Sequence, residues 1–378
     1  MSKRVVVGMS GGVDSSVAAY LLNQAGYDVI GLFMRNWDST TNKDVLGNPT
    51  LEDDLCPQEV DYQDAKRVCD FIGIPLHRVD FIEEYWQNVF MYFIDEYEKG
   101  RTPNPDIMCN KFIKFDAFKK YAEKFNPDFI AMGHYAQIRI GSSGNVQLLR
   151  GADANKDQTY FLSQLTQEQL KETLFPIGHY QKSEIRQIAK EINLPTAMKK
   201  DSTGICFIGE RAFNQFLRNY IPAQPGRILT QDGDDLGEHQ GLMHYTIGQR
   251  KGLGIGGSSA YGNEPWFVIG KSLTRNTLTV GQGFHHPELY STSCTLESVN
   301  MINPQINLQG LALTAKFRYR QADVPISIES SETEFKVIFK TPVRAVTPGQ
   351  SAVFYHGDVC LGGGIIQHVY QNHRQLPY

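Results

Sequence analysis

The 378-residue chain lacks the features that mark membrane, secreted and disulfide-rich proteins. No apolar run approaches the roughly 20 residues that a membrane-spanning helix needs. The first residues lead directly into a strand-like run, which predicts no signal peptide. Six cysteines are too few for a disulfide scaffold in a chain this long, and none form a C-x-x-C pair. We therefore expect a protein of the reducing cytoplasm with no membrane partner.

The chain also lacks an excess of positive charge. Lysine and arginine number 37 against 41 acidic residues, which leaves a net charge of −4. Such a balance is not typical of a nucleic-acid-binding protein, so any RNA-binding surface must be a local basic patch. The length is sufficient for two or three domains.

Strand-like and helix-like stretches alternate over residues 1–210. This alternation predicts an α/β fold, a doubly wound parallel sheet with helices on both faces. The predicted strands are 5–9, 27–34, 76–79 and 129–134, and the predicted helices are 61–72, 85–99 and 183–192.

The pattern changes after residue 210. Residues 211–286 contain a short helix-like stretch and a glycine-dense segment, and we expect a small mixed central domain there. Residues 287–378 show short strand-like runs separated by turns, which predicts an antiparallel β-barrel.

One loop, Ser10–Ser15, has the sequence SGGVDS and joins the first predicted strand to a predicted helix. Paired glycines let backbone N–H groups approach a ligand, and a helix N-terminus favours anions. Asp14 can hold a metal ion that bridges phosphate oxygens. The loop has no lysine after its glycines and is not G-x-G-x-x-G, so it differs from two common phosphate-binding motifs. The alternative is a helix start that Ser10 or Asp14 merely caps.

Met34 and the pair Gly133-His134 also fall where predicted strands end. Ligands of parallel α/β sheets collect beyond the carboxyl ends of the strands. We expect these residues to meet the Ser10–Ser15 loop around one nucleotide, with His134 as a polar contact to substrate or as a structural residue.

Two cysteines stand in unusual contexts. Cys109 follows a proline-stiffened loop, and a helical turn there would put Asp106 on the same face as a proton acceptor. Cys206 lies among glycines after Lys199 and Lys200, and nearby cations lower the pKa of a thiol. The alternatives for both are a buried structural role or a zinc site, although the spacings fit no usual zinc pattern. We expect Cys69, Cys294 and Cys360 to be core residues.

The SGGxDS loop resembles that of the PP-loop, or N-type ATP pyrophosphatase, superfamily. Longer segments across nearly the whole chain resemble the bacterial tRNA-specific 2-thiouridylase family. These segments are Gly8–Ser15, Arg101–Lys114, Gly133–Tyr135, Asn155–Gln158, Asp201–Arg211, Gly237–Gly241, Gly248–Gly257 and Val346–Ala352.

The resemblance implies ATP-dependent 2-thiolation of the wobble uridine, position 34, of tRNA. The uridine C2 oxygen would be adenylated with release of pyrophosphate. Cys206 would carry a persulfide delivered by a sulfur donor protein, either a cysteine desulfurase or a sulfur-relay protein. Cys109 would be the second thiol, which would either free sulfide from the persulfide or resolve the transfer. It would end in a transient disulfide with Cys206, and Asp106 would be the acid/base group.

The resemblance also implies ATP with Mg²⁺ as cofactors, and we expect a monomer. Some relatives have a cysteine at the position of Asp106 and use an iron–sulfur cluster, so we expect no cluster here. The implied ATP-binding residues are Gly8, Met9, Ser10, Gly11, Gly12, Val13, Asp14, Ser15, Met34 and Gly133. The implied tRNA-binding residues are Asn104, Pro105, Asp106, His134, Lys156, Asp157, Gln158, Arg318, Tyr319 and Gln350.

Two other hypotheses keep the loop but change the function. An amidating synthetase would share the PP-loop and would not require a pair of reactive cysteines. A non-enzymatic RNA-binding or redox-sensing protein would bind RNA without releasing pyrophosphate, and the intact SGGVDS loop speaks against it.

Overall fold

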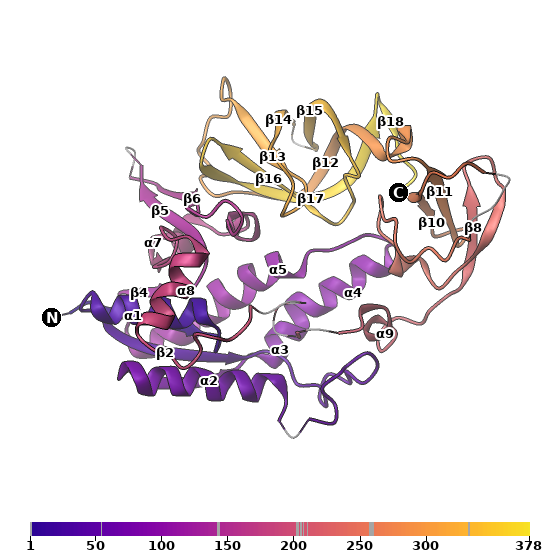
Figure 1. The fold of residues 1–378 in the computed structure, drawn as a ribbon. Coiled ribbons are helices and arrows are strands. Elements are labelled where there is room, and N and C mark those ends of the chain that lie inside the picture. Colours follow the sequence, from indigo (N-terminus) through magenta and orange to yellow (C-terminus); the bar gives the residue numbers. More distant parts are fainter. Residues whose placement is uncertain are drawn as a thin grey trace.

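The computed structural model describes residues 2–53, 55–141, 144–201, 204, 206, 208–209, 211–256, 261–331 and 333–378. The described residues form three sheets, one in each of three consecutive parts of the chain, N-terminal, central and C-terminal, which differ in colour in Figure 1. Among the helices within these ranges, none is long and apolar enough to cross a membrane.

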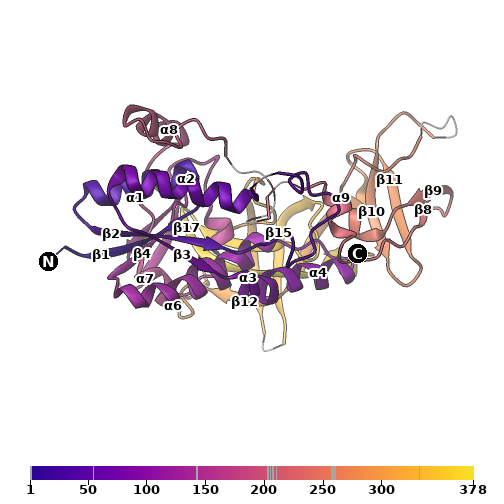
Figure 2. The same ribbon diagram turned by 90° about the horizontal axis from the view of Figure 1, so that it is seen from below.

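The N-terminal part is a five-stranded parallel sheet with the strand order β3-β2-β1-β4-β7. One apolar core lies between this sheet and α1, α2 and α8, and a second core lies between its other face and the remaining helices of this part (Figure 2). The doubly wound α/β prediction is confirmed. The strands are β1 (Arg4–Met9), β2 (Asp28–Arg35), β3 (Leu76–Asp80), β4 (Phe129–Ala131) and β7 (Thr173–Leu174). The helices are α1 (Val13–Gln24), α2 (Pro57–Ile72), α3 (Ile82–Tyr85), α4 (Met91–Glu98), α5 (Pro105–Met108), α6 (Phe118–Ala122), α7 (Gln167–Lys171) and α8 (Lys182–Glu191).

Two of the helical runs contain π-helical stretches. The predicted helix 85–99 is α3 and α4 joined by a π-helical turn, Trp86–Phe90. The next run consists of α5, a π-helix over Cys109–Ala117, and α6. π-Helical turns are rare and are frequent at functional sites. The second π-helix begins at Cys109, one of the two cysteines that stand in unusual sequence contexts.

The central part contains a four-stranded sheet with the order β10-β11-β8-β9. Its strands β8 and β11 are parallel, whereas the other pairs are antiparallel, which agrees with the expected mixed character. The elements are α9 (Phe213–Leu217), β8 (Gly226–Thr230), β9 (Asp235–His239), β10 (Trp266–Ser272) and β11 (Thr277–Gln282).

The C-terminal part is a closed antiparallel barrel, because β12 pairs with both β15 and β17. The expected barrel is therefore confirmed. A third core of alternating apolar side chains fills it. Its strands are β12 (Tyr290–Met301), β13 (Leu313–Lys316), β14 (Val324–Ser330), β15 (Phe335–Arg344), β16 (Ser351–His356) and β17 (Val359–Gln371), and β18 (Arg374–Gln375) pairs with β17.

A hairpin from the N-terminal part extends the barrel sheet. Strands β5 (Ala136–Ile140) and β6 (Val146–Arg150) follow β4 in the chain, and β6 pairs with the start of β17. The local sequence predicts no such pairing, because a strand partner more than 200 residues away leaves no trace in periodicity. The hairpin connects the parallel sheet to the barrel (Figure 1).

Candidate active site

The Ser10–Ser15 loop is built by hydroxyl hydrogen bonds rather than by a capping side chain. Gly12 is the N-cap of α1, and no side chain caps it. The hydroxyls of Ser10 and Ser15 lie 3.0 Å apart, and the Ser15 hydroxyl donates to the Gly12 carbonyl at 3.2 Å. The interpretation of this loop as a simple cap is therefore wrong.

Glycine is required at two positions around this loop, because backbone atoms of other segments lie too close for a side chain. Gly11 has φ +71°, and a Cβ there would lie 2.2 Å from the carbonyl oxygen of Asp61. A Cβ on Gly133 would lie 2.8 Å from the backbone nitrogen of Ser15. Because β1 lies between β2 and β4, the predicted nucleotide residues Met34 and Gly133 flank the loop at one sheet edge.

Asp14 is held by two residues that the sequence analysis missed. Lys182, at the N-terminus of α8, donates to both carboxylate oxygens of Asp14 at 2.8 Å. The hydroxyl of Tyr135 donates to one of these oxygens at 2.8 Å. Lys182 also pairs with Asp201 at 2.8 Å. A lysine thus stands at the loop although none follows its glycines, and only the fold brings it there.

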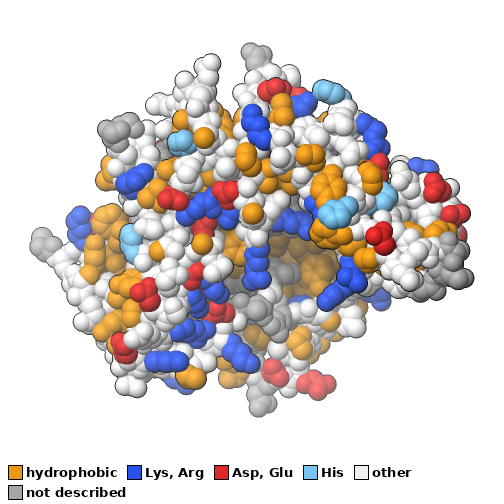
Figure 3. Space-filling model, turned by 45° about the horizontal axis from the view of Figure 1, so that its top comes forward, with side chains coloured by type: hydrophobic (Ala, Val, Ile, Leu, Met, Phe, Trp, Pro, Cys, Tyr) orange, Lys and Arg blue, Asp and Glu red, His pale blue; other side chains and the backbone are white. Residues whose placement is uncertain are grey.

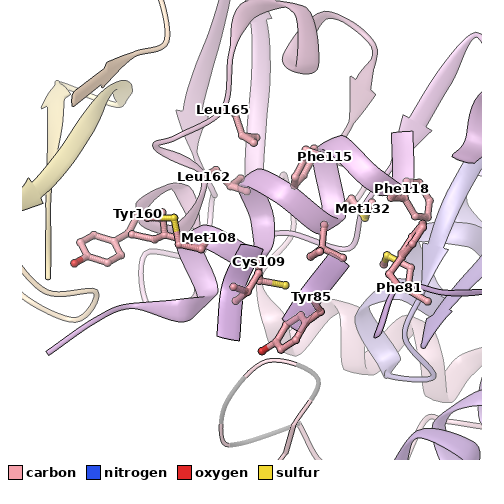
Figure 4. Close-up of a cluster of buried hydrophobic side chains, with 14 of the residues drawn as sticks. Phe81, Tyr85, Met108, Cys109, Phe115, Phe118, Met132, Tyr160, Leu162 and Leu165 are labelled. Atoms are coloured by element: carbon pink, nitrogen blue, oxygen red, sulfur yellow. The ribbon is translucent and has the colours of Figure 1, made fainter. Parts of the chain in front are cut away.

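The two singled-out cysteines meet. The Sγ atoms of Cys109 and Cys206 lie 3.7 Å apart as free thiols. The carboxylate of Asp106 accepts the backbone N–H of Cys206 at 3.3 Å, and the hydroxyl of Tyr85 donates to the Cys206 carbonyl at 2.8 Å. Figure 4 shows Cys109 beside Tyr85 in the buried cluster. In the segment 201–211, only Asp201, Gly204, Cys206, Ile208, Gly209 and Arg211 are described.

The surroundings of the two thiols shift their pKa values in opposite directions. The hydrogen bond from Cys109 lowers the pKa of Cys206, and the nearby Lys114 ammonium lowers it further against the effect of burial. Burial raises the pKa of Cys109 well above its usual value. Cys206 is therefore the thiol of the pair that ionises more readily, and Cys109 donates the hydrogen bond.

At the other buried cysteines, burial outweighs the effects of nearby charged groups. Cys69, Cys294 and Cys360 lie in apolar cores, as expected. Burial raises the pKa of Cys69 and of Cys360 to about 12. These thiols remain protonated and unreactive at neutral pH. In the described ranges, no three His, Cys, Asp or Glu side chains are grouped so that they could hold a metal ion.

A groove of about 1360 Å³ lies where the β5–β6 hairpin meets the barrel. Lys156 and Tyr319, both predicted RNA contacts, line it together with Asp157. The basic residues along the groove are Arg139, Arg150, Lys156, Lys316 and Arg320. Figure 3 shows Lys and Arg side chains around a hollow in one face of the molecule. Asp157, Asp323 and Asp358 line the groove as well, and Arg150 pairs with the first two of them. Basic side chains thus outnumber acidic ones in this groove, although the chain as a whole is net negative.

Several predicted RNA contacts also make internal hydrogen bonds. One guanidinium nitrogen of Arg318 donates to two backbone carbonyls and to Thr347. Gln350 donates to the carbonyls of Thr102 and Pro103, which ties the barrel to the loop that contains Asn104 and Pro105.

Three more of these residues also make contacts inside the fold. Asp157 is buried and accepts from Thr159 and from the backbone of Gly151. The side chain of Gln158 accepts the backbone N–H of Tyr135 at 2.9 Å. His134 is buried between the rings of Phe115 and Phe175, and burial lowers its pKa well below the usual value. His134 is consequently neutral.

Replacing Asp106 by asparagine tests the carboxyl directly. Burial raises the pKa of Asp106, so its ionisation opposes folding as pH rises above the ordinary aspartate range. We expect D106N to melt at a higher temperature than the wild type at pH 7, with the difference vanishing at acidic pH. We expect turnover to fall by roughly 10²- to 10⁴-fold, the usual contribution of an acid/base group. Calorimetry across pH and a turnover assay measure both. A lower melting temperature with full turnover would contradict this role.

The parallel sheet with its glycine loop is typical of α/β nucleotide-binding enzymes, and the same part of the chain contains the close thiol pair. Sequence models match the three parts in order. They are described as a tRNA methyl transferase HUP domain over residues 3–210, a tRNA methyl transferase PRC-barrel domain over 214–282, and an aminomethyltransferase β-barrel domain over 291–366.

Curated relatives match nearly the whole chain. The tRNA-specific 2-thiouridylase MnmA of Lacticaseibacillus paracasei is 57% identical over 99% of this chain and 97% of its own. Those of Ligilactobacillus salivarius and Staphylococcus epidermidis are each 57% identical over 99% of this chain and 98% of theirs. The chain belongs to the tRNA-specific 2-thiouridylase family.

Proposed function

We propose that this protein catalyses ATP-dependent 2-thiolation of the wobble uridine of tRNA. The observation that carries the proposal is the pair of free thiols, Cys109 and Cys206, 3.7 Å apart beside Asp106 in a chain with a pyrophosphate-binding loop. An amidating synthetase requires no such pair, so that alternative is not favoured.

The first step is adenylation of the uridine. The backbone N–H groups of the Ser10–Ser15 loop and the N-terminus of α1 bind the ATP phosphates. The uridine C2 oxygen attacks the α-phosphate, and pyrophosphate leaves. Lys182 supplies a positive charge at the loop. The Asp14 carboxylate would hold Mg²⁺ together with phosphate oxygens, and the ion would neutralise the charge on the departing pyrophosphate.

The second step delivers sulfur. Cys206 receives a terminal sulfur as a persulfide from a sulfur donor protein. The Cys109 thiol attacks the inner sulfur, forms the Cys109–Cys206 disulfide and releases hydrogen sulfide. The sulfide adds to C2 and expels AMP, which leaves 2-thiouridine. A cellular thiol then supplies two electrons that reduce the disulfide. Asp106, whose pKa is raised by burial, accepts and returns protons in these transfers.

The tRNA occupies the basic groove, and the target base flips out toward Asn104 and Pro105 because its C2 is inaccessible while stacked. Lys156 and Tyr319 supply a cation and a stacking surface along the groove. We keep the division into a catalytic domain (1–210), a central domain (211–286) and a barrel (287–378) as part of this proposal. We also propose that the protein is a monomer in a reducing cytoplasm and contains no iron–sulfur cluster.

The decisive experiment combines the protein with ATP, Mg²⁺, a sulfide or persulfide source and tRNA, followed by mass spectrometry of the nucleosides. We expect 2-thiouridine at position 34 and one pyrophosphate for each base modified. A matched reaction with sulfide but without ATP is the control. Pyrophosphate release without 2-thiouridine on an unmodified tRNA would refute the proposed acceptor chemistry.

A further inference from the structure

Lys114 lies on the same helical run as Asp106 and Cys109, and the π-helix determines which way it faces. Cys109 begins the π-helix, and Lys114 is five residues later. In an α-helix, residues five apart point about 140° away from each other. In a π-helix, the i→i+5 repeat places them on the same face. The backbone N–H of Phe118 bonds to the Ile113 carbonyl, which is this repeat.

The face that carries Cys109 and Lys114 is where Cys206 packs. The Cys206 sulfur lies 3.7 Å from that of Cys109, and its backbone N–H is held by Asp106. The Lys114 ammonium interacts with all three of these groups. The half-buried lysine therefore shares a pocket with two thiols and a carboxyl, three groups that can each become negative.

We propose that Lys114 is a catalytic residue whose ammonium holds the sulfur of Cys206 in its anionic form, first as thiolate and then as persulfide. This inference rests on the proposed function and adds a residue to it. An anionic sulfur beside a carboxyl in a partly dehydrated pocket is unfavourable unless a cation compensates it. Lys114 provides that cation from the helix that also carries the resolving thiol.

The charges around the two thiols support this assignment. Apart from Cys109, Lys114 is the group that lowers the pKa of Cys206, whereas Asp106 raises it. The phenol of Tyr85 donates to the Cys206 backbone and stays neutral, because burial raises its pKa. His134 is also near Lys114 and is neutral, because burial and the lysine charge lower its pKa. Among the residues that the structure describes, Lys114 is thus the cation of this pocket.

The test measures the alkylation of Cys206 by iodoacetamide between pH 5 and 10, resolved from the other cysteines by peptide mass spectrometry. In the wild type, we expect a midpoint below the ordinary cysteine value of about 8.5. In K114Q, we expect the midpoint to rise by about one unit or more, which is about tenfold slower alkylation at pH 7. K114R should stay close to the wild type because it keeps the charge.

K120Q is the matched control, because Lys120 follows on the same helical run but is exposed and pairs with Asp116. It should leave the profile unchanged. If K114Q fails to fold, K114M, which keeps the aliphatic stem, replaces it. A wild-type midpoint above the ordinary value, or identical profiles for wild type and the neutral variants, would overturn the role of Lys114.

The same variants separate this inference from the proposed function. We expect K114Q to make 2-thiouridine roughly tenfold more slowly while its tRNA-dependent release of pyrophosphate stays unchanged, because adenylation does not use the thiolate. The alkylation profile needs neither ATP nor tRNA. Absence of 2-thiouridine in the wild type would therefore refute the proposed function and leave the lysine result standing.

Discussion

C206S is expected to lose 2-thiouridine formation by on the order of 10³-fold or more, because it removes the atom that carries sulfur. Serine is nearly isosteric, and Cys206 is only partly buried, so the fold should survive. C109S should lose turnover as well but still accept a persulfide on Cys206. Both variants should release pyrophosphate with tRNA present, because the adenylation step uses the nucleotide loop. Nucleoside mass spectrometry and a pyrophosphate assay measure the two steps separately.

C56S is the matched control for these variants. Cys56 is exposed and precedes α2, where serine is a favourable N-cap residue. It should retain full activity. Turnover by C206S at the wild-type rate would show that sulfur reaches the uridine without this cysteine. Loss of pyrophosphate release in both variants would mean that the thiols and the adenylation step are not separable.

G133A is expected to weaken ATP binding by roughly 10- to 100-fold. A Cβ at this position would lie 2.8 Å from the Ser15 nitrogen and 3.0 Å from the Asp14 carbonyl carbon. These are backbone atoms of the Ser10–Ser15 loop, so no side chain can move aside to relieve the clash. Overpacking of this kind usually amounts to about 1–3 kcal/mol, and about 1.4 kcal/mol is a tenfold change in affinity. Equilibrium ATP binding and tRNA-dependent pyrophosphate release measure it.

G262A controls for the added methyl group. Gly262 lies in the central part, and a Cβ there meets no described atom within 4 Å. We expect its ATP affinity to equal that of the wild type. Equal ATP affinity in G133A and the wild type would contradict the inference that this glycine shapes the loop.

Much of the N-terminal part could be predicted because its signals are local. The strand before the loop, the paired glycines and the helix after it occupy adjacent residues, and strand–helix alternation implies parallel pairing. The expectation that Met34 and Gly133 flank the loop follows from the same rule. The predicted strand 129–134 is shorter in the structure, where β4 ends at Ala131.

The functional partners of Asp14 and Cys109 could not be predicted in this way. Lys182 reaches Asp14 from 168 residues away, and no motif connects them. Lys114 is close to Cys109 in the sequence, yet an α-helical interpretation directs it away from the thiol. The i→i+5 register that turns it inward is a property of the folded backbone, which no residue pattern here announces.

The sequence by itself determined the class of fold, the glycine loop between the first strand and the first helix, and the two cysteines with unusual neighbours, because each is written in consecutive residues. Only the tertiary structure decided that Cys109 and Cys206, 97 residues apart, lie 3.7 Å from each other with different protonation preferences. The physical reason is that the pKa of a thiol depends on burial and on nearby charges, and these are set by contacts between distant segments.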